Sequence, residues 1–208
     1  MSVTLASWKR LWGELGAVTV NGGLMNQLVA AYSERQRHYH TLQHLRECLA
    51  QLEAGAALAR RPAEVELALW FHDAVYDPLR ADNEERSAQW ARDSVLAAGS
   101  TPEIAQRVHD LVLVTRHHVA PADDPDAALL LDVDLAILGA APGRFDEYER
   151  QVRAEYAHVE ESAFRARRAG LLAAFLARPR IYATAAFHDA LEQRARANLQ
   201  RSIASLSP

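Results

Sequence analysis

The residues most able to do chemistry lie in the segment from Leu67 to Asp77, which reads LALWFHDAVYD. Within it an apolar run carries His72 next to Asp73, and the second acid, Asp77, follows one turn later. Both histidine and aspartate are costly to bury unless a charged or hydrogen-bonding group receives them. A metal ion would be such a group. The segment therefore predicts a metal centre.

Further candidate ligands lie far from this pair in the sequence. His40 and His44 are upstream, four residues apart, and Asp132 and Asp134 are downstream in the apolar segment AALLLDVDLAILG. Residues four apart share one face of a helix, whereas residues two apart point in different directions. We therefore expect His40 or His44, and one of the two aspartates, to join the pair. The working set is His40, His72, Asp73 and Asp134, with His44, His117 and His118 in reserve.

The ligand types indicate which ions such a centre would take. Imidazole and carboxylate ligands suit Mn, Fe, Co, Ni or Zn and, more marginally, Mg. Cys48 is the one cysteine of the chain, which argues against a disulfide framework and a cysteine-based zinc site and agrees with a reducing cytoplasm. A divalent ion lowers the pKa of bound water from about 15.7 toward about 7 and polarises a phosphoryl oxygen. The expected chemistry is phosphoester hydrolysis by a metal-activated water.

Phosphoester hydrolysis also needs cations around the departing charge and an acid for the leaving group. The side chains that we expect to contact substrate are Arg37, Arg116, His117, His118, Arg150 and Arg153. The candidate catalytic acids and bases are Asp73, Asp77 and Glu84. Glu84 has the weaker claim, because acids are also favoured in the first turn of a helix. A salt-bridged surface would explain Arg150 and Arg153 equally well.

Hydrophobic periodicity predicts helices that would position these groups, and no alternating run of Val, Ile or Thr indicates a strand. The expected helices include residues 41–59, with Thr41 as N-cap, and a helix opened by Thr101 and Pro102. Residues 63–76 are apolar nearly all round, which predicts a central, buried helix. The fold class is all-α. With 208 residues, we expect one helical domain, its metal-site core at about 32–140 and its C-terminal helices at about 145–206 packed on that core.

Charge and hydropathy limit the partners. The net charge of −4 gives no basic footprint, which disfavours nucleic acid as the main partner. The N-terminus lacks a secretory apolar segment, and no apolar run is long enough for a membrane span. We expect a cytoplasmic protein with no membrane partner. Apolar faces on the late helices would support a homodimer, although burial within one domain explains them equally well.

The ordered pattern His40, His72-Asp73, Asp134 in a helical chain resembles the HD superfamily of metal-dependent phosphohydrolases. RHYHTLQHL, ALWFHDAVYD, DNEERSA, LLLDVDLAILG and YERQVRAEYAHV resemble a bacterial branch described as predicted HD-superfamily phosphohydrolases. The resemblance runs from about residue 32 to the end of the chain. It implies a single HD-type helical domain, an ion held by those four residues and a phosphate ester or nucleotide-like substrate. His40 is preferred to His44 because Arg37 to Thr41 resembles the usual first motif, and His117 or His118 could add a second metal.

Two other interpretations use the same residues. A regulatory HD domain would keep the pocket and bind a nucleotide or metabolite with little turnover. Alternatively, the histidines and acids would only hold a helical bundle together. A catalytic site keeps an open coordination position, whereas a structural site is closed. A second His-Asp pair, His188-Asp189, lacks the flanking ligands and is interpreted as a surface or structural pair.

Overall fold

The computed structural model describes residues 3–206, and over that range it contains α-helices and short 3₁₀ turns but no strand. The prediction of an all-α chain is confirmed. No helix in this range is long and apolar enough to cross a bilayer. The chain divides into two compact units between Val133 and Asp134, at the last residue of helix α7. One HD-type domain spanning the whole chain stays a prediction.

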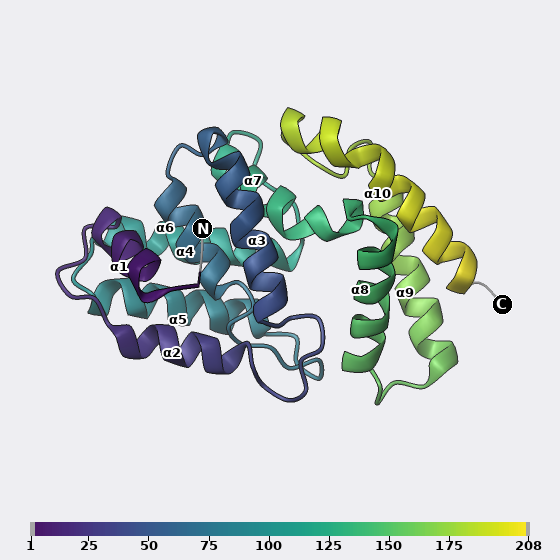
Figure 1. Cartoon of the computed structure of the whole chain (residues 1–208), viewed down its shortest axis with the longest axis horizontal. Helices are drawn as coiled ribbons and strands as arrows, with labels where there is room; N and C mark the ends of the chain where they lie inside the picture. The colour runs from purple at the N-terminus through teal and green to yellow at the C-terminus, as the bar shows by residue number, and fades with distance from the viewer. Residues whose placement is uncertain (1–2, 207–208) are drawn as a thin grey trace. The chain divides into compact units, whose positions relative to one another are not determined.

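The first unit contains the helices that carry most of the predicted site (Figure 1). They are α1 (Leu5–Glu14), α2 (Gly22–Ala31), α3 (Leu42–Gly55), α4 (Pro62–Phe71), α5 (Asn83–Ala97), α6 (Pro102–Leu113) and α7 (Pro125–Asp134). Two of them begin as predicted. The hydroxyl of Thr41 accepts the N–H of Gln43 ahead of α3, and that of Thr101 accepts the N–H of Ile104 ahead of α6. The first cap places His44 in the first turn of α3.

Helix α4 is the centre of the first unit. It packs against α1, α3, α5 and α6, and its side chains from Glu64 to Phe71 are all buried. A helix with no polar face is stable only where neighbours cover it on every side. At its C-terminal end the ring of Trp70 meets that of Trp8 edge-on, with ring centroids 4.9 Å apart. Such aromatic contacts add to the free energy gained by burial.

Helix α4 ends at Phe71, earlier than the predicted end at residue 76. His72 still has helical backbone angles, and Asp73 lies in the turn that follows. The apolar pattern continues through Ala74 and Val75, which explains why the sequence predicts a longer helix. The consequence is that the His-Asp pair sits where the chain leaves the core.

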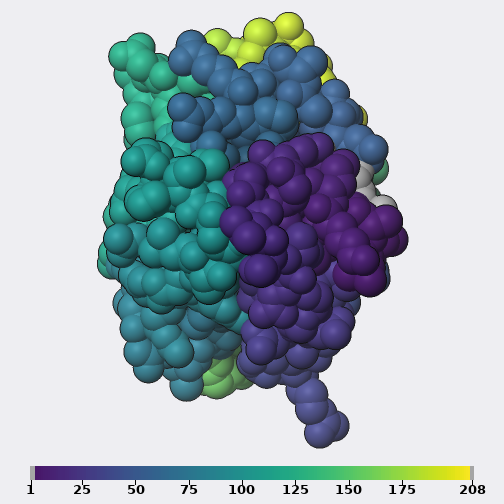
Figure 2. All heavy atoms as spheres, turned by 90° about the vertical axis from the view of Figure 1, so that its left-hand side faces the viewer, coloured from purple at the N-terminus to yellow at the C-terminus, as the bar shows by residue number. Residues whose placement is uncertain are grey.

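On the surface of the first unit, the N-terminal helices α1 and α2 lie next to α5 and α6. In Figure 2 the purple surface of α1 and α2 adjoins the teal surface of α5 and α6. The N–H groups of Val18 and Thr19 both donate to the carbonyl of Ala98, at 2.8 and 3.1 Å. Gly99 follows with a φ of +79°, and a Cβ there would lie 3.1 Å from the Val18 side chain. Glycine therefore suits this turn for both backbone and steric reasons.

The second unit consists of the 3₁₀ turn Leu135–Gly139 and helices α8 (Pro142–Glu155), α9 (Glu161–Leu176) and α10 (Ala185–Leu206) (Figure 1). Helix α10 packs on α9 and on the 3₁₀ turn. The side-chain amide of Asn198 donates to the carbonyl of Leu138 at 2.9 Å. The carboxylate of Glu192 accepts the N–H groups of Ile181 and Tyr182 at 3.0 and 3.2 Å. These bonds satisfy buried backbone groups of the connecting segments.

The central position of α4 can be tested with two leucines. Leu67 is 0% exposed, so Leu67→Ala should leave a cavity and lower the free energy of unfolding by about 2–5 kcal/mol. Leu79 is 76% exposed, and Leu79→Ala should change it by less than about 0.5 kcal/mol. Urea unfolding followed by circular dichroism measures both. Equal, small effects would contradict a core built around α4.

The 3₁₀ turn of the second unit offers a second matched pair. A Cβ on Gly139 would lie 2.7 Å from the Cβ of Leu191 and 2.9 Å from the hydroxyl of Tyr182. Gly139→Ala should therefore destabilise the protein by about 1–3 kcal/mol through overpacking. Gly143 lies in α8 with open space around it, so Gly143→Ala should be neutral or stabilise by up to about 1 kcal/mol. Thermal unfolding would contradict the close packing if both variants behaved alike.

Candidate metal centre

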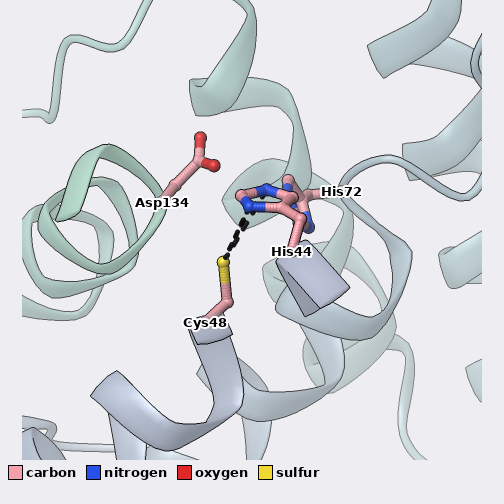
Figure 3. Close-up of side chains that lie close together, drawn as sticks. All are labelled: His44, Cys48, His72 and Asp134. Carbon is pink, nitrogen blue, oxygen red and sulfur yellow. Dashed lines mark hydrogen bonds between the residues drawn. The ribbon is translucent and has the colours of Figure 1, made fainter. Parts of the chain in front are cut away.

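Four donor side chains gather at one place in the structure. His44, Cys48, His72 and Asp134 each offer one ligand atom, and these atoms all lie within 4.8 Å of one another. His44 and Cys48 lie one turn apart on α3, and His72 follows α4 (Figure 3). Asp134 is the last residue of α7, whose other residues belong to the first unit. The first three are buried and Asp134 is partly exposed, and the group could hold a metal ion.

The two imidazole rings present nitrogens to the same point. Nε2 of His44 lies 3.0 Å from Nε2 of His72. Two nitrogens that each bind one ion at about 2.1 Å would lie about 3.0 Å apart at a right angle and about 3.4 Å apart at a tetrahedral angle. Nδ1 of His72 lies 2.8 Å from the carbonyl oxygen of Leu69, which can only accept, so Nδ1–H donates to it. In the neutral ring Nε2 then carries a lone pair toward the cluster, as a metal ligand requires.

One carboxylate oxygen of Asp73 forms a triangle with the two Nε2 atoms of His44 and His72. Its Oδ2 lies 3.0 Å from Nε2 of His72 and 3.5 Å from Nε2 of His44. Burial would raise the pKa of the Asp73 carboxyl, but the coulombic effect of His72 and His40 and hydrogen bonds from His44 and His72 hold that pKa well below its usual range. An ionised oxygen and imidazole lone pairs this close repel one another unless a proton or a metal ion lies between them. The arrangement therefore fits a bound cation.

Arg37 fixes the backbone that carries the pair. Its side chain is 0% exposed. Nη1 donates to the carbonyls of Asp73 and His40 at 2.6 and 3.2 Å, and Nη2 donates to the carbonyl of Ala74 at 3.1 Å. One guanidinium thus ties the segment before α3 to the turn after α4. Arg37 acts here as a positioning residue, and its predicted contact with substrate stays a prediction.

Tyr32 holds the same turn from the other side. Its hydroxyl accepts the N–H of Asp73 at 3.4 Å and donates to the carbonyl of Leu69 at 3.5 Å. Burial raises the pKa of Tyr32 to about 12, so the hydroxyl keeps its proton at neutral pH. The guanidinium carbon of Arg37 lies 5.3 Å from the centre of the Tyr32 ring, which adds a cation–π contact.

His40 lies beside the donor group. It is half-buried and stacks on Tyr76, with ring centroids 4.1 Å apart. The resemblance favoured His40 over His44 as first ligand, whereas the four-donor group contains His44. The charge of His40 acts on Asp73, so His40 belongs to the surroundings of the centre. Its role as a direct ligand stays a prediction.

Cys48 is the donor that sequence reasoning did not single out. Its Sγ lies 3.7 Å from both ring nitrogens of His44 (Figure 3). Because it is the chain's one cysteine, it seemed to argue against a thiolate at the site. The signal was its spacing: a residue four positions after His44 shares the same helix face. A mixed site needs only one thiolate.

The other predicted acids and bases lie outside the four-donor group. Oδ1 of Asp77 accepts the N–H of Leu79 at 2.9 Å, and the N–H of Asp77 donates to Oδ1 of Asn83 at 3.2 Å. These bonds fasten the loop between α4 and α5. Glu84 is partly exposed in the first turn of α5, as its helix-start interpretation predicts. A catalytic role for Asp77 or Glu84 stays a prediction.

Apart from the buried Arg37, the predicted substrate contacts of the first unit lie in one connection, which follows α6. Arg116 forms an ion pair with Glu85, and both side chains are exposed. His117 is exposed, and His118 has a φ of 49°, in the left-handed region that non-glycine residues seldom adopt. These residues form the connection that follows α6. Contact between them and a substrate stays a prediction.

The predicted contacts of the second unit lie on α8. Arg150 is exposed. Arg153 donates to the carbonyls of Tyr156 and Val159 at 2.6 and 3.1 Å and pairs with Glu161 at 2.8 Å, so it orders the α8–α9 connection. Their contact with substrate stays a prediction.

The second His-Asp pair also lies in this unit. Nδ1 of His188 lies 3.1 Å from Oδ1 of Asp189 on α10, and the Asp189 side chain is 78% exposed. It is a surface pair, as the sequence predicts.

The chain was compared with known families, curated proteins and solved structures. No family model matches it, and neither the curated proteins nor the solved structures gave a match. The candidate site is therefore judged by its own geometry. An all-helical chain that brings His, Cys and Asp donors together is compatible with an HD domain.

The role of Arg37 in holding the site can be tested by unfolding. Arg37→Ala should lower the free energy of unfolding by about 3 kcal/mol or more, because it strips donors from buried carbonyls. Arg37→Lys should recover only part of this loss, since the ammonium group of lysine does not reproduce the planar guanidinium with its several N–H donors. The exposed Arg35 provides the control: Arg35→Ala should change the value by less than about 0.5 kcal/mol. Similar small changes for Arg35→Ala and Arg37→Ala in urea unfolding would rule out the positioning role.

Proposed function

We propose that this protein is a metal-dependent phosphohydrolase of the HD type, acting on a phosphoester of a nucleotide or another small phosphorylated metabolite. The observation that carries the proposal is the triangle of Nε2 of His44, Nε2 of His72 and Oδ2 of Asp73, with sides of 3.0–3.5 Å. Three such atoms need a proton or a metal ion among them, and a metal ion would satisfy all three at once. The order His, His-Asp, Asp along the chain also agrees with the HD resemblance, which favours His40 as the first histidine, whereas the donor group contains His44.

The chain's own residues would hold and orient the ion. The ligands in this proposal are His44, His72, Asp73 and Asp134. The carbonyl of Leu69 fixes the His72 ring through Nδ1–H, and Arg37 fixes the backbone of Asp73. When bound, a divalent ion would lower the pKa of a water molecule toward about 7 and polarise a phosphoryl oxygen.

Access to the centre supports hydrolysis more than a closed structural site. The side chain of Asp73 is 20% exposed, whereas those of His44 and His72 are 3% and 2% exposed. Solvent thus reaches the carboxylate side of the ligand set while the imidazoles stay buried. A catalytic metal site keeps one position open in this way. The choice of a phosphoester over other esters comes from the resemblance.

The remaining roles follow from this proposal. Asp77 and Glu84 are the candidates for protonating the leaving group, because they lie in the segment that follows the His-Asp turn. Arg116, His117 and His118 are the candidate contacts to phosphate. Cys48 is a free, buried thiol, which agrees with action in a reducing cytoplasm.

The proposal is tested by metal analysis and a phosphatase screen. Purified protein should contain a divalent ion and hydrolyse at least one nucleotide or sugar phosphate when loaded with Zn, Mn, Co, Ni or Mg. Asp73→Ala should lose at least about tenfold in metal affinity, and its turnover should fall with it. The exposed pair provides the control: Asp189→Ala should keep both metal and turnover.

The outcomes separate the alternatives. Bound metal in the wild type without turnover on any phosphoester would favour the regulatory binding domain. An absence of metal under every loading condition would overturn the metal centre and leave the histidines and acids a structural role. Equal losses in Asp73→Ala and Asp189→Ala would show that the assay does not report on this site.

A further inference from the structure

We infer that Cys48 is a ligand of the centre and that its sulfur makes the site select a borderline-soft ion, such as Zn²⁺, Co²⁺ or Fe²⁺, over Mg²⁺ and Mn²⁺. This inference rests on the metal site of the proposed function. It reduces the set of ions that imidazole and carboxylate ligands alone would predict. It also assigns a role to a buried nucleophile that the proposed hydrolysis does not use.

The position of the sulfur matches that of a shared ligand. Sγ lies 3.7 Å from both Nε2 and Nδ1 of His44. A nitrogen at about 2.1 Å and a sulfur at about 2.3 Å from one ion, at a tetrahedral angle, would lie about 3.6 Å apart. The same sulfur is within 4.8 Å of the ligand atoms of His72 and Asp134. The thiol thus belongs to the same group of four donor atoms, which could hold a metal ion.

Helix α3 leaves the thiol little freedom to point elsewhere. Cys48 follows His44 by one turn, and both side chains are buried. Leu45, Leu49 and Leu52 are also buried, which holds this helix against its neighbours. A cysteine that only filled space would be expected among hydrocarbon side chains. Here it faces ring nitrogens and a carboxylate.

The ligand chemistry decides which ions benefit. Thiolate ligands favour ions such as Zn²⁺, whereas Mg²⁺ is bound through oxygen ligands and keeps several water molecules. A His-Asp set without sulfur accepts both kinds of ion. Adding one thiolate raises the affinity for the softer ions without helping Mg²⁺. Cys48 is therefore the residue that sets metal specificity.

Cobalt provides a direct readout of the sulfur bond, separate from catalysis. Co²⁺ added to the metal-free full chain should produce a near-ultraviolet sulfur-to-cobalt charge-transfer band at one equivalent. The chain has one cysteine, so the band can come only from Cys48. Cys48→Ser and Cys48→Ala should lose the band. The ratio of Zn²⁺ to Mn²⁺ affinity should fall at least about tenfold in Cys48→Ser. Circular dichroism of each variant checks that it is folded.

The outcomes keep this inference apart from the proposed function. Stoichiometric Co²⁺ binding by the wild type without a charge-transfer band would overturn the role of Cys48 and leave the metal centre standing. An unchanged Zn²⁺ to Mn²⁺ ratio in a folded Cys48→Ser variant would overturn the specificity role. No Co²⁺ or Zn²⁺ binding by the wild type would overturn the inference together with the metal centre.

Discussion

The burial of α4 on every side is the constraint on which the first unit depends. Because the helix has no polar face, α1, α3, α5 and α6 must all cover it. The same burial brings the chain's exit from α4 next to the first turns of α3. His72, at that exit, can then meet His44 from the covering helix. The hydrophobic effect thus assembles polar ligands by fixing the helices that carry them.

Gathering polar groups at the end of a buried helix has an electrostatic cost, and Arg37 offsets part of it. The last carbonyls of a helix lack partners within the helix and form its negative end. Arg37 places a permanent positive charge on the carbonyls of Asp73 and Ala74, just beyond the end of α4. Tyr32 adds a neutral donor to the carbonyl of Leu69. The turn keeps its shape because its acceptors are satisfied by the protein.

Much of this arrangement is readable from the sequence, and the misses have specific causes. The apolar α4, the Thr41 and Thr101 caps and the exposed His188-Asp189 pair follow from local patterns. The place of His44 in the donor group also had a local clue. Thr41 as N-cap leaves His40 outside α3 and places His44 inside it. The family resemblance favours His40, whose role as a ligand stays a prediction.

Contacts between segments that are distant along the chain could not be predicted from the sequence. Nothing near Arg37 indicates that its guanidinium reaches a turn 36 residues later. Cys48 has the right helical spacing from His44, but its approach to Asp134 depends on where α7 ends. The predicted continuation of α4 to residue 76 failed because apolar residues also line the turn. Local sequence patterns predict the helices, whereas tertiary contacts determine which side chains form the donor group.

Because His72 lies at the end of the central helix, an ion bound at the proposed centre would link metal supply to the lifetime of the protein. An ion that binds the folded state and not the unfolded chain stabilises the fold by mass action. The backbone of a helix buried on all sides opens to solvent chiefly through global unfolding. Occupancy of the centre would then slow opening of the whole first unit, and a metal-starved cell would present more of the unfolded chain to its proteases.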